Sequence, residues 1–139
     1  MKSARAWTGT VAVATAAFAV FSAAPATAAT AAATLSIGGA VVAADDLVNV
    51  TVTYTCDAGY TGEIVAYVND STASAFGGSD EVVATCDGAS HTVVIPVDND
   101  NDATDYKAGN SALVAAALDA TKTGSPEVDA AQDVTLTLG

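Results

Sequence analysis

The chain has 139 residues, in which 16 Asp and Glu outnumber 4 Lys and Arg and give a formal net charge of −12. This length allows one domain, and the charge excludes nucleic-acid binding as the default function, because a phosphate backbone requires a footprint of Lys and Arg. Hydrophobic residues make up 51% of the chain and charged residues only 14%, so the composition argues against intrinsic disorder despite the acidity.

Residues 1–28 have the three parts of a secretory signal peptide. Lys2 and Arg5 form a positive head, residues 7–21 are an apolar stretch, and residues 26–28 read Ala-Thr-Ala, a cleavage motif. A membrane anchor is the alternative, but the apolar stretch is short for a span of about 20 residues. We therefore expect cleavage after residue 28, a secreted extracellular protein, and no membrane span once the signal is removed.

Period-2 alternation predicts seven short strands after a flexible lead-in at 29–33. In residues 48–56 every second side chain is Val, Tyr or Cys and the intervening ones are Asn or Thr, which is typical of a strand with one buried face. A helix over 112–122 is an alternative, because Ala favours helices. In chain order, the predicted strands are at 35–37, 48–56, 64–68, 81–86, 92–97, 113–118 and 134–138.

Seven strands in a chain of this size predict one domain over 34–139, an all-β, immunoglobulin-like antiparallel sandwich, with a small open β-barrel as the alternative. Cys56 and Cys86 predict one disulfide, because an even number of cysteines outside the cytoplasm indicates pairing. In the plain sandwich order, however, their strands are about 9.5 Å apart, whereas a disulfide requires Cα atoms within roughly 7 Å. Either Cys86 leaves its strand before pairing, or the strand order differs from the plain one.

Several segments carry a resemblance that extends over most of 34–139. They are Thr-Val-Thr-Tyr-Thr-Cys at 51–56, Ala-Thr-Cys-Asp-Gly-Ala-Ser-His-Thr at 84–92, and the later stretches 108–118 and 131–136. In these segments the chain resembles a small family of secreted actinobacterial proteins that is known as a domain of unknown function. Its most specific motif is Cys-Asp-Gly-x-x-His, and it often has an aromatic residue where this chain has Val93. The resemblance implies secretion and a β fold, and it implies no activity.

The densest acidic run is a candidate calcium loop. Its carboxylates are Asp98, Asp100, Asp102 and Asp105, and calcium takes six to eight oxygen ligands. Ala103 replaces the glycine of an EF-hand loop and Gly109 stands where its last glutamate would be, so only a calcium loop of another kind fits. The alternative is a solvated acidic loop that keeps the protein soluble. Four more aspartates are expected at the same end of the sandwich: Asp45, Asp46, Asp70 and Asp80.

Other candidate site residues are few. His91 follows the turn at 87–88, and we expect it to bond locally to that turn, because no nucleophile can be placed within reach. Tyr60 and Phe76 are predicted in loops and are candidates for binding, since loops on a rigid scaffold carry recognition and aromatic residues anchor interfaces. The alternative is that both fold over a sheet edge.

These patterns favour a secreted, monomeric, non-enzymatic sandwich domain that binds an extracellular protein or small molecule, or serves as an envelope component. No cofactor is expected unless calcium binds. One alternative is a calcium-stabilised extracellular domain that uses the acidic segment 98–105. A secreted hydrolase that uses acidic residues is another alternative, and it would need a pocket lined by two or more buried carboxylates.

Overall fold

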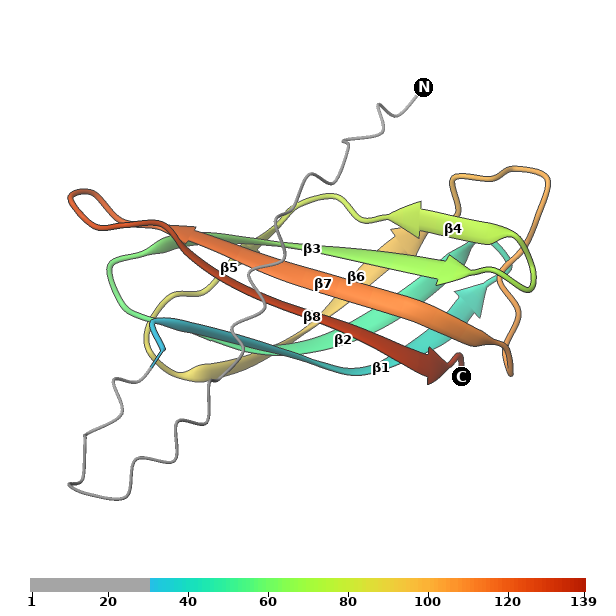
Figure 1. The fold of residues 1–139 in the computed structure, drawn as a ribbon, viewed down its shortest axis with the longest axis horizontal. Helices are drawn as coiled ribbons and strands as arrows, with labels where there is room; N and C mark the ends of the chain where they lie inside the picture. Colours follow the sequence, from blue (N-terminus) through green and yellow to red (C-terminus); the bar gives the residue numbers. More distant parts are fainter. Residues whose placement is uncertain (1–30) are drawn as a thin grey trace, which may run out of the picture.

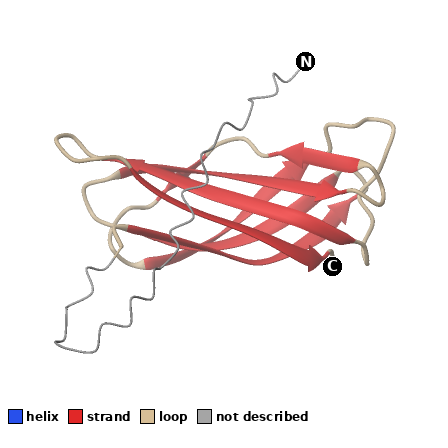
Figure 2. Cartoon of the chain, viewed as in Figure 1, coloured by secondary structure: helices blue, strands red, loops and turns tan. Residues whose placement is uncertain are grey.

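Eight antiparallel strands and no helix make up the part of the chain that the structure, a computed structural model, describes: residues 31–139 (Figures 1 and 2). The predicted signal peptide and the first residues of the predicted lead-in lie outside this range. Residues 31–139 therefore also contain no helix that is long and apolar enough to cross a membrane. The strands are β1 (Ala33–Ala44), β2 (Leu47–Cys56), β3 (Thr61–Asp70), β4 (Ala75–Gly78), β5 (Val82–Ala84), β6 (Ser90–Asp98), β7 (Ser111–Thr121) and β8 (Val128–Thr137).

The strands form two sheets, as predicted for a β-sandwich. The smaller sheet has the order β1-β2-β6, and the larger sheet has the order β4-β3-β7-β8, with β5 beside the other half of β3 (Figure 1). We call these the small sheet and the large sheet. Every second residue of β2, and likewise of β3, is buried between them, so the alternation read from the sequence corresponds to the inward face of each strand.

The alternative prediction of a helix over 112–122 is wrong, because this segment forms strand β7. Its residues pair with β3 on one side and with β8 on the other, so packing in the sheet overrides the helix preference of alanine. The inward side chains are small or branched: Ala112, Val114, Ala116, Leu118 and Ala120. They supply one wall of the core, which faces the valines of β2 across the sandwich.

The structure has one strand more than the seven predicted. Strand β4 covers residues expected to be a loop, so Phe76 lies on a sheet and not in a connection. Strand β4 cannot be predicted from side-chain alternation, because two of its four residues are Gly77 and Gly78. Glycine has no side chain and is unfavourable in strands. At the start of the domain, Ala33, the last residue of the predicted lead-in, begins β1 and is only 6% exposed.

The disulfide joins the two sheets. Cys56 ends β2 in the small sheet, and Cys86 follows β5 at the edge of the large sheet, with a Cα–Cα distance of 4.4 Å. The order therefore differs from the plain one, because β5 pairs with β3 and not with β6, and Cys86 has also left its strand. Beside the bridge, the Thr85 main-chain N–H donates to the Tyr54 hydroxyl at 2.8 Å, which ties the two sheets together a second time.

The opposite side of the sandwich is closed where β1 meets β8. The Ile37 N–H donates to the side-chain oxygen of Gln132 at 2.6 Å, next to an irregularity in the pairing of β1. Further along, the Val42 N–H donates to the Gly139 carbonyl at 2.9 Å, and the Gly139 N–H donates to Ala40 at 3.0 Å. These bonds satisfy main-chain groups of β1 that the β2 partner does not use.

Strand β4 approaches the end of β6 so closely that Gly77 has no room for a side chain. A Cβ there would overlap the main-chain carbonyl oxygen of Asp98, whereas a Cβ at Gly78 would have its nearest neighbour, the Ala66 carbonyl oxygen, 4.0 Å away. The contact is fixed by the Asp100 N–H, which donates to the Phe76 carbonyl at 2.8 Å. Gly77 is thus required by the approach of the two sheets.

We expect Gly77→Ala to lower the free energy of unfolding by about 3 kcal/mol or more, because the backbone of β4 must move away from β6. Gly78→Ala is the matched control and should change stability by less than about 1 kcal/mol. Urea unfolding of both variants measures the difference. Equal unfolding midpoints for the two variants would contradict this account of β4.

Candidate functional site

The outer face of the large sheet carries apolar side chains from four of its strands. Three are large and exposed: Phe76 is 42% exposed, Leu113 43% and Val83 78%. The register places Phe76 and Leu113 on either side of Asn69 in one row, and Tyr67 beside Ala115 in the next row. We call the outward-facing set the apolar face; its members are Val65, Tyr67, Phe76, Val83, Leu113 and Ala117.

The outer face of the small sheet is different in chemistry. Most of its outward positions hold Thr, Ser or Asn, and two pairs of hydroxyls meet across strands: Thr34 with Thr55 at 2.6 Å and Thr53 with Thr92 at 3.0 Å. Its exposed large hydrophobic residues are Val41 and Val94, and the register puts them in different rows, opposite Asn49 and Thr51. This face follows the pattern usual for a solvated sheet surface, which the large sheet does not.

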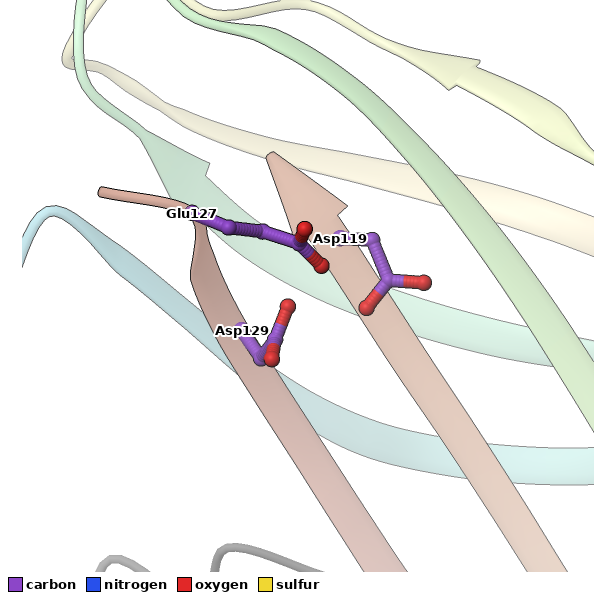
Figure 3. A group of neighbouring side chains, drawn as sticks. All are labelled: Asp119, Glu127 and Asp129. Carbon is purple, nitrogen blue, oxygen red and sulfur yellow. The ribbon is translucent and has the colours of Figure 1, made fainter. Parts of the chain in front are cut away.

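A row of three carboxylates crosses the large sheet at one end of the apolar face. Glu63 of β3 lies opposite Asp119 of β7, and Asp119 lies opposite Asp129 of β8. Glu127, just before β8, adds a fourth, and one oxygen each from Asp119, Glu127 and Asp129 lie within 4.8 Å of one another (Figure 3). Like charges directly opposite on a sheet are destabilising. We call these four residues the acidic row.

The surroundings of Asp119 in the acidic row favour its protonated form. Partial desolvation, a hydrogen bond with Asp129 and the negative charges of Asp129, Glu127 and Glu63 raise the pKa of Asp119 to about 6. When protonated, Asp119 can donate to Asp129 and remove one of the crowded charges. When all are ionised, the oxygens are the ligands that a hard cation such as calcium takes.

The predicted calcium residues do not form such a group in the described residues, 31–139, where carboxylates gather only in the acidic row. Asp98 ends β6, and the segment after it is organised by amides. The Asn99 side-chain oxygen accepts from Asn101 N–H at 3.0 Å, and the Asn101 side chain donates to the Ser74 carbonyl at 2.9 Å. Calcium binding by Asp98, Asp100, Asp102 and Asp105 stays a prediction.

Tyr106 anchors the far end of this segment in the core, where it is 1% exposed. Its main-chain N–H donates to the Asp45 carbonyl at 2.8 Å. Burial raises the pKa of its hydroxyl, and that hydroxyl has no hydrogen-bond partner within the described residues. No pattern in the sequence predicts this role, because a lone aromatic residue outside a strand belongs to no alternation that would place it.

Asp70, one of the four further aspartates expected near the acidic segment 98–105, is not solvated, because it is fully buried at the end of β3. One carboxyl oxygen accepts from the Ala73 N–H and the other from the Lys107 N–H, both at 3.2 Å. The Asn110 side-chain amide lies 3.0 Å from both oxygens. Asp70 therefore connects the β3–β4 turn to the segment that enters β7.

The motif Cys-Asp-Gly-x-x-His has a structural explanation in this chain. After the disulfide at Cys86, Gly88 adopts a positive φ of 81° and its N–H donates to the Cys56 carbonyl at 2.8 Å. His91 Nε2 lies 2.8 Å from the Asp87 carboxylate, which also accepts from the Ala89 N–H. The His91 bond, aided by the Ala89 bond, lowers the pKa of Asp87. His91 thus bonds locally, through a carboxylate of the turn.

The two aromatic candidates for binding have different surroundings. Tyr60 is partly buried, packs against the core, and has the Lys122 Nζ 5.5 Å from the centre of its ring. Phe76 faces outward on the large sheet as part of the apolar face. A binding role for either residue stays a prediction, but only Phe76 belongs to a larger exposed surface.

Comparison with the models of known protein families and with curated proteins finds no match. The resemblance to a secreted actinobacterial family therefore stays an expectation. The acidic row is the feature that sequence reasoning missed. A signal for it exists in retrospect, because a hairpin that turns at 124–126 brings residues near 119 and 129 opposite each other.

We expect Asp70→Ala to lower the free energy of unfolding by about 3 kcal/mol, because the amide groups of Ala73, Lys107 and Asn110 lose their acceptor in a buried place. Asp80→Ala removes an exposed aspartate and serves as the control. Urea unfolding at neutral pH compares the two. A wild-type midpoint for Asp70→Ala would show that these bonds do not hold the turn.

The Asp119 pKa gives a pH dependence of known sign. Because the folded value, about 6, exceeds the unfolded value of about 4, the folded state binds more protons between them, and stability falls as the pH rises through this window. We expect Asp119→Asn to raise the melting temperature at pH 7.5 by a few degrees, equivalent to about 1 kcal/mol after allowance for solvent screening.

At pH 4, where Asp119 is protonated, the same substitution should have little effect on the melting temperature. Asp133→Asn is the matched control, because Asp133 lies on the same outer face of β8 opposite Ala115 and its replacement changes the net charge equally. If both variants change the melting temperature equally at every pH, the effect belongs to net charge and not to the acidic row.

Proposed function

We propose that this chain is a secreted β-sandwich that acts by binding an extracellular partner through the apolar face of the large sheet, without an enzymatic step. The observation that carries the proposal is the exposure of three large apolar side chains on one sheet face, with Phe76 and Leu113 flanking Asn69 in one row and Val83 beside Glu63 at the other end. Large contiguous apolar patches on the surface of a soluble protein mark interaction sites.

The contrast between the two sheets supports this proposal. The outer face of the small sheet is rich in Thr and Ser, with paired hydroxyls such as Thr53 with Thr92. This composition is the usual one for a sheet face in contact with water. In the large sheet, the outward positions of β3, β4 and β7 include Val65, Tyr67, Phe76 and Leu113. A face that had only to meet water would gain nothing from these residues.

Two features support a location outside the cell. The sequence begins with the three parts of a signal peptide, and the Cys56–Cys86 disulfide is of a kind that persists in oxidising compartments. Both fit a binding domain that meets its partner after export. The N-terminus of the protein recovered from culture medium tests this part of the proposal, with cleavage after residue 28 as the expected result.

The binding role is tested by capture from culture medium on immobilised mature protein. We expect the wild-type protein to retain a partner that the double variant Phe76→Ser, Leu113→Thr loses, since both apolar anchors are gone. The matched control is the double variant Val41→Thr, Val94→Thr, which removes two residues that are at least as exposed (54% and 55%) from the small sheet and should leave capture intact. A partner retained equally by all three proteins, or by none, would refute binding through the apolar face.

A further inference from the structure

We propose that the partner bound on the apolar face presents a cationic amphipathic protein segment, with apolar side chains over Phe76 and Leu113 and Lys or Arg side chains over the acidic row. This inference rests on the proposed function and adds the chemistry of the partner. It follows from the arrangement of apolar and acidic residues on one sheet.

The first observation is that the two features share one continuous face. Along β3, Asn69 lies between Phe76 and Leu113, and Glu63 lies six residues away on the same side of the strand. Six residues of a strand span about 20 Å. Between these ends the outward positions are Val65 and Tyr67 of β3 with Ala117 and Ala115 of β7 beside them, so no gap separates the apolar end from the acidic end.

The second observation is the cost of the acidic row to the free protein. Three carboxylates stand directly opposite one another on adjacent strands, an arrangement that opposes folding. Both lysines of residues 31–139 have other neighbours, since Lys107 lies 3.6 Å from Asp105 and Lys122 lies over the Tyr60 ring. A cationic group brought by a partner would relieve the repulsion between the carboxylates.

Charge also decides between possible occupants. A second copy of this chain would bring the same acidic row and a net charge of −12, so like charges would meet across the interface. A metal ion could neutralise the carboxylates but would leave the apolar end uncovered. A segment with apolar residues at one end and Lys or Arg at the other satisfies both parts of the face.

The proton on Asp119 makes this recognition pH-dependent. The groups that face Asp119 are Glu63 from β3, and Asp129 and Glu127 from β8 and the turn before it. A cationic partner favours ionised Asp119, whereas acidification through about pH 6 protonates it and removes one charge from the row. Affinity for a cationic segment should therefore fall as the pH drops from 7.5 to 5.

The test uses isothermal titration of the mature protein with synthetic peptides. The probe is a 12-residue peptide with two Trp at one end and four Lys at the other, joined by Gly and Ser. One control peptide has Glu in place of Lys, and a second has Ser in place of Trp. We expect the probe to bind at pH 7.5 about tenfold tighter than either control peptide, and to weaken at pH 5 and in 1 M salt.

Protein variants assign the binding to the two ends of the face. Asp119→Asn with Asp129→Asn should weaken the probe about tenfold and remove most of the pH dependence, while Leu113→Thr should weaken it by a similar factor at every pH. Asp45→Asn with Asp46→Asn, in the exposed turn between β1 and β2, is the matched control for charge and should bind like the wild type.

The outcomes separate this inference from the proposed function. Equal binding of the Lys and Glu peptides, lost in Leu113→Thr, would overturn the cationic partner and leave the apolar face as a binding site. Equal binding of the Trp and Ser peptides would also overturn it, because charge alone would suffice. No binding by the probe, together with partner capture that depends on Leu113, would refute only the inference. Loss of both the probe binding and the capture would refute both.

Discussion

Alternation of side chains along each strand fixes both the core and the two outer faces of this protein. Residues such as Val50 and Ile64 point inward and are fully buried, and their neighbours along the chain must then point outward. Because adjacent strands are locked in register, outward residues form rows across a sheet. The apolar face spans several such rows and the acidic row is one of them, so the core packing that defines the sandwich also assembles the candidate site.

The two sides of the sandwich are closed by different means, and this leaves the outer faces free for separate uses. On one side the disulfide and the Tyr54 hydroxyl join the sheets, and on the other β1 bonds to β8. The small sheet faces outward with paired hydroxyls, and the large sheet with Phe76, Leu113 and the acidic row. A rigid frame of this kind would hold the proposed binding face in place with little loss of entropy on binding.

Acidic residues serve three separate purposes in this fold. Asp70 is buried and accepts hydrogen bonds that fix a turn, and Asp87 accepts from His91 beside the disulfide. In the acidic row, partial burial and the neighbouring carboxylates together raise the pKa of Asp119. A net charge alone cannot distinguish these environments, because each depends on which donors or charges the fold brings near.

The sequence by itself determined the β class, the Cys56–Cys86 pairing and most strands, because a period of two and a cysteine pair are local signals. It did not find β4, where Gly77 and Gly78 leave no pattern, and it placed Phe76 in a loop. Only the tertiary structure decided the strand order that lets Cys86 reach Cys56, the burial of Asp70 and Tyr106, and the row of Glu63, Asp119 and Asp129. These features depend on register and on contacts between distant strands, which no single segment of the sequence encodes.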